Sequence, residues 1–225
     1  MTSLHLALTI DAHDPARLAD FWAGILPLPG PDTQVGLRFA QSDGQRVGPN
    51  RVHLHVTSTS LEDQEATVAA ALQLGGSHLD VGQLPEEGHI VLADPEGNEF
   101  CVIEPGSSFL AGCGRLGELA CDGTRAVGLF WAEALGWPLV WDENEETAIQ
   151  SPYGGTKVAW GGPPVAPKRG RNRQRFDLTV IDGDLAVEAD QLVGLGATWL
   201  DEAADGAVEL ADPDGNEFRL GRGRR

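Results

Sequence analysis

The chain has 225 residues, of which 41% are hydrophobic and 22% charged, a composition typical of a folded globular protein rather than a disordered one. Its 34 acidic and 16 basic residues give a net charge of −18, which repels phosphate backbones and anionic membranes. We therefore expect neither nucleic acid nor a membrane as a partner. The sequence contains no apolar stretch long enough for a membrane span and no basic N-terminal segment, so we predict a cytoplasmic protein.

Alternating and helical patterns define the elements of the first half. Apolar residues alternate with other residues over 4–10, which predicts a strand with one apolar face. Asp14 is suited to cap, and Pro15 to open, a helix that stops at Pro27. The remaining predicted elements are a strand over 35–39, a strand over 52–56, a helix over 61–74, and short strands at 90–92 and 100–102.

The second half repeats the first. The segment LADPEGNEF over 92–100 returns over 210–218 as LADPDGNEF, with eight of its nine positions identical. This repeat predicts two modules, 1–106 and 115–222, joined by a linker over 107–114. The shared Asp-Pro-x-Gly pattern has the preferences of a type I turn, so we expect it to join two strands and to do no chemistry.

Several segments taken together resemble the vicinal oxygen chelate superfamily, which includes glyoxalase I, bleomycin-resistance proteins and extradiol dioxygenases. They are DPARLADFW, NRVHLHV and VLADPEGNEFCVIEP in the first half, and AVGLFWAEALGWPLVW, RNRQRFDLTV and ELADPDGNEFRL in the second. The resemblance covers nearly the whole chain. It implies an α+β fold of two tandem modules, each of paired βαβββ units that form a curled mixed sheet around a groove.

The resemblance also implies a metal site in the groove. The superfamily's ligands are a His or Gln on the first strand, a His on the strand that opens the second unit, and a Glu on the last strand. His5, His53 and Cys101 occupy these positions here. Strand alternation independently turns these three residues, with His55 and Glu99, away from the apolar faces. A thiolate in place of the carboxylate makes the site softer, so we favour hydrogen-bonding roles for both histidines over a metal.

The second half departs further from the ligand pattern. Arg175 replaces the second histidine and Arg219 replaces the final ligand, whereas the match to the first ligand, near 115–118, is ambiguous. Arginine cannot coordinate a cation. The two arginines can bind a carboxylate or phosphate of a ligand, or pair with Asp177 and Glu217, and we favour the internal pairs.

Basic residues and tryptophans supply the remaining candidates. Five basic residues over 168–175 predict a solvated loop that pairs with the acidic surface of the protein. Trp22 and Trp131 lie on predicted helix core faces. Trp137, Trp141 and Trp160 flank the second groove and are candidate ligand platforms.

We predict a glyoxalase-like protein that binds a small organic molecule without a metal, in the manner of resistance proteins that sequester antibiotics. The candidate ligand-binding residues are His55, Glu99, Cys101, Trp141, Trp160, Arg175 and Arg219. The alternative is a lyase, isomerase or dioxygenase in which His5 and His53 are catalytic, with a divalent metal (Zn, Ni, Co, Mn or Fe) or as an acid/base pair. A third hypothesis is a regulatory module that contacts another protein. Tandem modules are compatible with a monomer or a homodimer.

Overall fold

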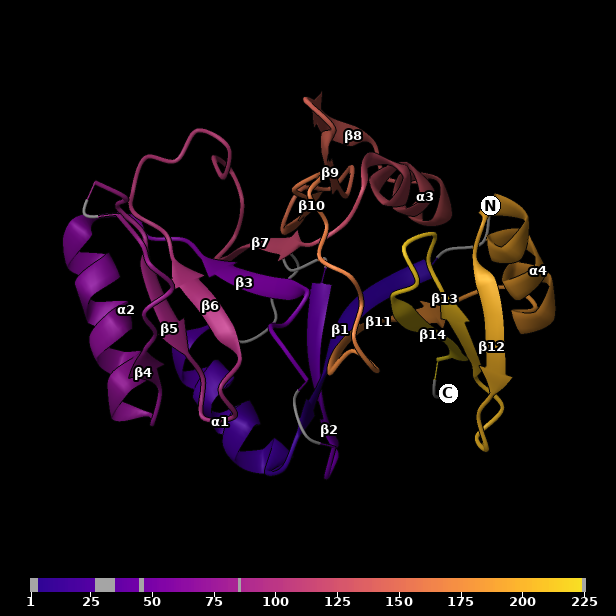
Figure 1. Ribbon diagram of the computed structural model, residues 1–225, viewed down its shortest axis with the longest axis horizontal. Coiled ribbons are helices and arrows are strands. Elements are labelled where there is room, and N and C mark those ends of the chain that lie inside the picture. The colour runs from indigo at the N-terminus through magenta and orange to yellow at the C-terminus, as the bar shows by residue number, and fades with distance from the viewer. Residues whose placement is uncertain (1–3, 27–34, 45–46, 85, 224–225) are drawn as a thin grey trace.

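The structure is a computed structural model that describes residues 4–26, 35–44, 47–84 and 86–223. These residues form four helices and two mixed sheets (Figure 1). The helices are α1 (Pro15–Ile25), α2 (Leu61–Gln73), α3 (Arg125–Leu135) and α4 (Leu185–Leu195). Sheet A has the strand order β12 (Thr198–Glu202), β13 (Val208–Ala211), β14 (Glu217–Arg222), β11 (Gln174–Val180), β1 (Leu4–Ala12) and β2 (Val35–Gln41). Sheet B has the order β4 (Ser77–His78), β5 (Ile90–Ala93), β6 (Glu99–Val102), β3 (Val52–Val56), β7 (Leu116–Cys121), β10 (Lys157–Trp160), β9 (Glu146–Gln150) and β8 (Leu139–Glu143).

Every element predicted in the first half is present. The Asp14 side chain accepts a hydrogen bond from the Arg17 backbone N–H at 3.0 Å, and Pro15 opens α1 as expected. The helix ends at Ile25, and Pro27 lies outside the described residues. The two-residue strand β4 was not predicted, because a strand of this length carries no periodicity.

Each sheet is assembled from both modules. β1 pairs with β11 in sheet A, and β3 pairs with β7 in sheet B, both in antiparallel fashion. The chain therefore consists of four units, of which the first shares a sheet with the fourth and the second with the third. This pairing covers strand edges that would otherwise expose unpaired backbone groups. The predicted α+β fold with two tandem modules is confirmed, and the structure adds that each sheet joins units of different modules rather than units of one module.

The repeated turn anchors the first helix of each module. In the first module the Asp94 carboxylate accepts a hydrogen bond from Trp22 Nε1 of α1 at 3.4 Å. In the second module Asp212 accepts the same bond from Trp131 Nε1 of α3, also at 3.4 Å. The turn joins β5 to β6 and β13 to β14, as predicted. Its contact with the helix is an additional role that the turn pattern alone did not predict.

Aromatic residues from both modules meet in one continuous core. Trp22 contacts Phe100 of β6 edge to face, with ring centroids 5.0 Å apart, and Trp131 contacts Phe218 of β14 in the same way at 4.9 Å. The two tryptophans are 2% and 1% exposed, which confirms their predicted packing role. Such contacts add about 1 kcal/mol each beyond the burial of apolar area.

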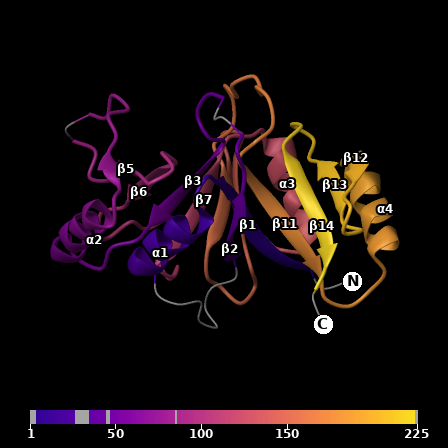
Figure 2. The same ribbon diagram turned by 90° about the horizontal axis from the view of Figure 1, so that it is seen from below.

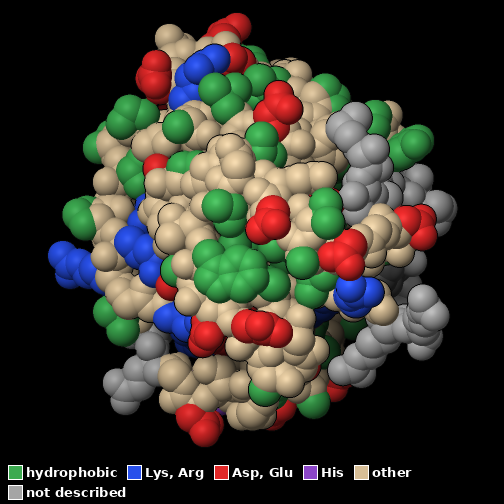
Figure 3. Space-filling view, turned by 90° about the vertical axis from the view of Figure 1, so that its right-hand side faces the viewer, with side chains coloured by type: hydrophobic (Ala, Val, Ile, Leu, Met, Phe, Trp, Pro, Cys, Tyr) green, Lys and Arg blue, Asp and Glu red, His purple; other side chains and the backbone are tan. Residues whose placement is uncertain are grey.

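Helices α2 and α4 lie at opposite ends of the molecule (Figure 1 and Figure 2). At the end that carries α4 and β12, hydrophobic side chains form separate patches among acidic ones (Figure 3). None of the helices formed by the described residues has the length and apolar character needed to cross a bilayer.

Candidate functional site

Each sheet has a groove on the face turned away from the core. The groove of sheet A has a volume of about 830 Å³, and that of sheet B about 710 Å³. His5 lies on β1 in sheet A, whereas His53 and Cys101 lie on β3 and β6 in sheet B. The three predicted metal ligands therefore do not meet at one site, and His5 and His53 do not form an acid/base pair. The physical reason is that the first and second units of a module contribute to different sheets.

A row of polar residues crosses sheet B. Strand registers place these five side by side on neighbouring strands: Cys101, His55, Glu118, Lys157 and Gln150. Nδ1 of His55 donates a hydrogen bond to Oε2 of Glu118 at 2.7 Å. The His55 and Glu118 side chains are only 22% and 10% exposed. A short hydrogen bond between largely buried charged groups fixes the orientation of the imidazole.

The environment of His55 changes its proton affinity. Burial alone would lower its pKa, but hydrogen bonds to Cys101 and Glu118 and the negative charge of Glu118 outweigh burial and raise the pKa to about 9. His55 is therefore an imidazolium at neutral pH. It presents a positive charge to the thiol of Cys101 on one side and to the carboxylate of Glu118 on the other.

A second row runs parallel to the polar row on the same face of sheet B. The registers place these five side by side: His53, Ala120, Ala159, Ala148 and Trp141. The three alanines give the groove a low floor, because a methyl group occupies little of the space above the sheet. The second row thus forms a small apolar platform between an imidazole and an indole.

Aromatic side chains form the wall at one end of the groove. Trp141 is 39% exposed and packs edge to face against Phe109, with ring centroids 6.1 Å apart. Nζ of Lys157 lies 4.4 Å from the centroid of the Phe109 ring and donates a hydrogen bond to the Phe109 carbonyl oxygen. This end of the groove therefore combines flat apolar surfaces with a cation.

Two other residues predicted to bind ligand in sheet B have structural contacts instead of free faces. The Glu99 carboxylate accepts a hydrogen bond from Asn50 Nδ2 at 2.8 Å, at the start of β3. Trp160 borders the groove but is 2% exposed and belongs to the core. Trp137 also packs against the core. Of the three tryptophans proposed as platforms, Trp141 is the one with an exposed ring in the groove.

The arginines of sheet A pair with carboxylates, as we predicted, but with different partners. Arg175 donates two hydrogen bonds to Asp11 of β1, at 2.8 and 2.9 Å, and Arg219 pairs with Asp205. Asp177 pairs with Arg38 of β2 at 2.9 Å. The predicted partners were chosen from neighbouring sequence positions, whereas Asp11 lies on β1, which the fold places beside β11, and Asp205 lies in the turn between β12 and β13. The charged groups of this groove largely neutralise one another.

The basic loop over 168–175 also pairs with the protein's own acidic residues, as predicted. Besides the pair of Arg175 with Asp11, the loop forms ion pairs of Lys168 with Glu217 at 2.6 Å, Arg171 with Glu209 at 2.9 Å and Arg173 with Glu96 at 3.3 Å. Because Glu96 belongs to the first module, the last of these pairs links the two modules.

Comparison with known proteins identifies the family of this chain. A model of the glyoxalase-like domain matches the chain twice, over residues 7–103 and 118–221. The chain belongs to the glyoxalase-like domain family. This assignment places it in the vicinal oxygen chelate superfamily, as the sequence motifs predicted.

Solved structures show the same glyoxalase-like fold. Glyoxalase I from Zea mays is 14% identical with a TM-score of 0.61, over 97% of this chain and 92% of that chain. A Bacillus subtilis protein described as a dioxygenase is 13% identical with a TM-score of 0.61, over 98% of this chain and 85% of that chain. At these identities the likeness shows the fold alone. No curated protein sequence matches the chain significantly.

The described residues of this glyoxalase-like protein do not fit the metal site that the superfamily implies. His5 is in the other sheet, and His53 and Cys101 lie in different rows of sheet B. No group of three or more His, Cys, Asp and Glu side chains in the described ranges is arranged to hold a metal ion.

Three residues of the sheet B groove were missed as site residues. Glu118 lies where the first-strand match was ambiguous, Phe109 lies in the segment interpreted as a linker, and Lys157 is on a strand of the second module that was not predicted. The alternation of Glu118 and Ala120 with Leu119 and the buried Cys121 was the available signal, since it indicates a strand with a polar face.

Proposed function

We propose that this glyoxalase-like protein binds a small organic molecule in the groove of sheet B, and that binding needs no metal. The observation that carries the proposal is the pair of rows across this sheet. One row supplies a floor of alanines that ends at Trp141, and the other supplies the charged groups of His55, Glu118 and Lys157. Ligand sites commonly combine an apolar surface with a few fixed polar groups in this way.

The layout of the groove indicates the chemistry of the ligand. A flat apolar ring fits over the alanine floor and against Trp141, because aromatic side chains favour edge-to-face or offset contact with other rings. Lys157, which lines the groove, favours a carboxylate or another hydrogen-bond acceptor on the ligand. The volume of about 710 Å³ is within the usual range of small-molecule pockets. We therefore expect a planar molecule that carries an acidic or strongly accepting group.

We prefer the groove of sheet B as the ligand site because fewer of its charged residues are engaged in ion pairs. In sheet A, Arg38, Arg175 and Arg219 each have a carboxylate partner, so a ligand would have to break ion pairs to bind them. In sheet B, His53, Ala120 and Trp141 border the groove beside a single ion pair. A ligand that enters the groove of sheet B therefore disrupts fewer ion pairs than one that enters the groove of sheet A.

A thermal-shift screen tests the proposal. Planar aromatic carboxylic acids are added to protein freed of metal by chelator, and in parallel Zn, Ni, Co, Mn and Fe are added with and without each compound. Binding to the native state raises the melting temperature, so we expect stabilisation by compounds of this class with the chelator present. Elemental analysis showing close to one equivalent of metal, lost in His53→Ala together with compound binding, would contradict the proposal and favour the metal enzyme.

A further inference from the structure

A cavity of about 330 Å³ lies between the loop that precedes β3 and the loop that precedes β11. Its lining comes from both modules, over 47–51 and 166–174, together with Asp122. The basic residues of the lining are Arg51, Lys168, Arg169, Arg171 and Arg173. In a chain with a net charge of −18, such a gathering of cations around one cavity attracts anions locally.

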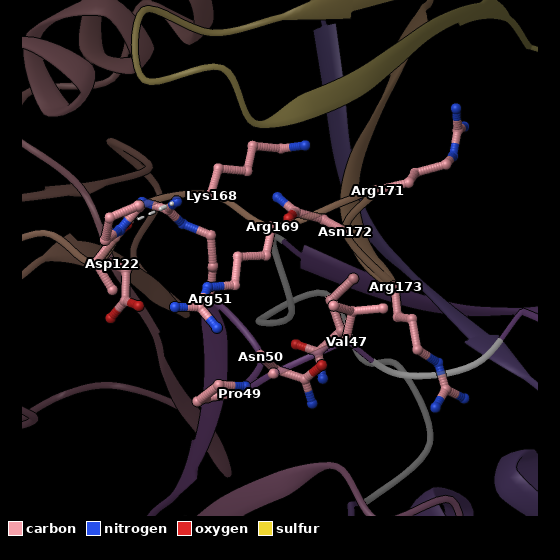
Figure 4. A pocket seen from close by; sticks show the side chains of 14 residues that line it. Val47, Pro49, Asn50, Arg51, Asp122, Lys168, Arg169, Arg171, Asn172 and Arg173 are labelled. Carbon is pink, nitrogen blue, oxygen red and sulfur yellow. Dashed lines mark hydrogen bonds between the residues drawn. The ribbon is translucent and has the colours of Figure 1, made fainter.

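Two of these five basic residues, Arg51 and Arg169, form no ion pair among the described residues. Lys168, Arg171 and Arg173 each pair with a glutamate outside the cavity lining. Figure 4 shows the guanidinium groups of Arg171 and Arg173 extending away from the side on which Arg51, Arg169 and Asp122 lie. Within the described ranges of the chain, neither Arg51 nor Arg169 forms an ion pair.

Arg51 is held in position by the opposite loop. It donates a hydrogen bond from one terminal nitrogen to the carbonyl oxygen of Ala166 at 3.3 Å. Its Nε is buried and has no hydrogen-bond partner among the described residues. The guanidinium is therefore fixed at the cavity and retains unused donors.

Gln174 provides an independent indication of a ligand. It lines the cavity and is 3% exposed, and neither its Nε2 nor its Oε1 has a hydrogen-bond partner among the described residues. The repeat aligns Asn172-Arg173-Gln174 with Asn50-Arg51-Val52, so the equivalent position in the first module is an apolar residue, 8% exposed. The fold thus accepts valine here, whereas a buried amide without partners costs free energy. A partner from outside the protein explains why the amide is present.

We infer that this cavity binds a small molecule bearing an oxyanion, either a carboxylate or a phosphate. Arg51 and Arg169 pair with the negative oxygens, and the Gln174 amide donates a further hydrogen bond. Asp122 accepts a hydrogen bond from a hydroxyl group elsewhere on the ligand. None of the three donors lines the groove of sheet B, and Asp122 borders both spaces.

Isothermal titration calorimetry at constant ionic strength tests the inference, with inorganic phosphate and malate as the two probes. We expect saturable binding of one probe, which identifies the oxyanion. Arg169→Gln and Gln174→Val should each weaken binding about tenfold, the equivalent of one lost hydrogen bond to a charged group. Arg171→Gln is the matched control, because its side chain lines the cavity but already binds Glu209, and it should change binding by less than about twofold.

Melting temperature gives a second readout. Gln174→Val should raise the melting temperature of the unliganded protein, because it removes the unpaired amide and copies Val52 of the first module, yet it should reduce the stabilisation produced by a given concentration of the anion. Absence of saturable binding of both probes would overturn the inference. So would an equal loss in Arg171→Gln, which would mean that general charge attracts the anion, or unchanged affinity in Gln174→Val.

Discussion

At the scale of the residue, His55 links folding to pH. Its pKa rises from 6.5 to about 9 on folding because the interactions with Cys101 and Glu118 exceed the effect of burial. Between these two values the folded chain binds more protons at this position than the unfolded chain. The stabilising contribution of the charged imidazole is therefore complete below about pH 6.5 and is lost as the pH rises through about 9.

Comparison of the wild type with His55→Gln isolates this contribution. Glutamine keeps a hydrogen bond to Glu118 but cannot take up a proton. At both pH values we compare the free energy of unfolding of the wild type with that of the variant. We expect the wild type's advantage to be larger at about pH 6 than at about pH 9.5, by on the order of 2–3 kcal/mol. Urea unfolding at both pH values measures it. A difference independent of pH would show that His55 is neutral in the folded protein.

The three cysteines should differ in reactivity. Burial raises the pKa of the Cys113 thiol and raises that of Cys121 strongly. Cys101 is partly exposed and lies beside His55 on the neighbouring strand. We predict that iodoacetamide modifies Cys101 first at neutral pH, because burial raises the pKa of the other two thiols. Peptide mass spectrometry over time follows all three sites, and faster labelling of Cys113 would contradict the prediction.

At the scale of the element, the repeated turn connects the first helix of each module, α1 or α3, to a sheet by hydrogen bonds. Besides Trp22 Nε1, the Asp94 carboxylate accepts hydrogen bonds from the backbone N–H groups of Glu96 and Asn98, both at 2.9 Å. Glu96 in turn accepts a hydrogen bond from the backbone N–H of Asp14, at the start of α1, at 2.9 Å. The strong similarity of the two turn sequences is thus explained by structure and needs no chemistry.

Asp94→Ala should destabilise the protein by about 3 kcal/mol, because several buried donors lose their acceptor at once. Asp80→Ala is a suitable control, since Asp80 is exposed and, among the described residues, its side chain accepts a single hydrogen bond, from the backbone N–H of Gly82. We expect the control to change stability by less than about 0.5 kcal/mol. Denaturant titration of both variants measures the difference, and equal effects would show that the turn contributes only locally.

Element type was predictable from the sequence, and strand pairing was not. Apolar periodicity in β1, α1 and β3 reports which face of each element is buried, so these elements were predicted correctly. The same periodicity is compatible with any partner strand. It could not reveal that β1 lies beside β11, and for that reason the predicted partner of Arg175 was wrong.

At the scale of the whole molecule, one kind of contact joins the two modules and another joins the two sheets. Hydrogen-bonded sheets connect one module to the other, whereas the turn-to-helix contacts at Asp94 and Asp212 connect the two sheets within each module. A separated module would keep its turn-to-helix contact and lose the sheet hydrogen bonds to the other module. Its first strands would expose unpaired edges, which favour association with other chains.

Separate expression of residues 1–106 and 107–225 tests this account. We expect neither half to remain a folded monomer, and we expect the mixed halves to form a one-to-one complex with the stability of a single cooperative unit. Size-exclusion chromatography with light scattering gives the masses. A half that is monomeric and unfolds cooperatively would show that the contacts between modules are dispensable.

The site was predictable only in part, for the same topological reason. His53, His55 and Cys101 were recognised from strand alternation and Trp141 as an aromatic platform beside the groove, and the structure gathers all four in one sheet. Glu118 comes from the other module, so its hydrogen bond to His55 depends on a pairing of strands that no local pattern encodes. The site therefore forms only when strands of both modules pair in sheet B.

The most direct test of the central claim is to fill each groove in turn. Ala159→Trp places an indole on the floor of the sheet B groove, and Ala40→Trp does the same in the sheet A groove. With the most stabilising compound from the screen, calorimetry should show binding weakened about tenfold or more in Ala159→Trp and unchanged in Ala40→Trp. Wild-type affinity in a folded Ala159→Trp protein would contradict the account, because the ligand would then bind outside the sheet B groove.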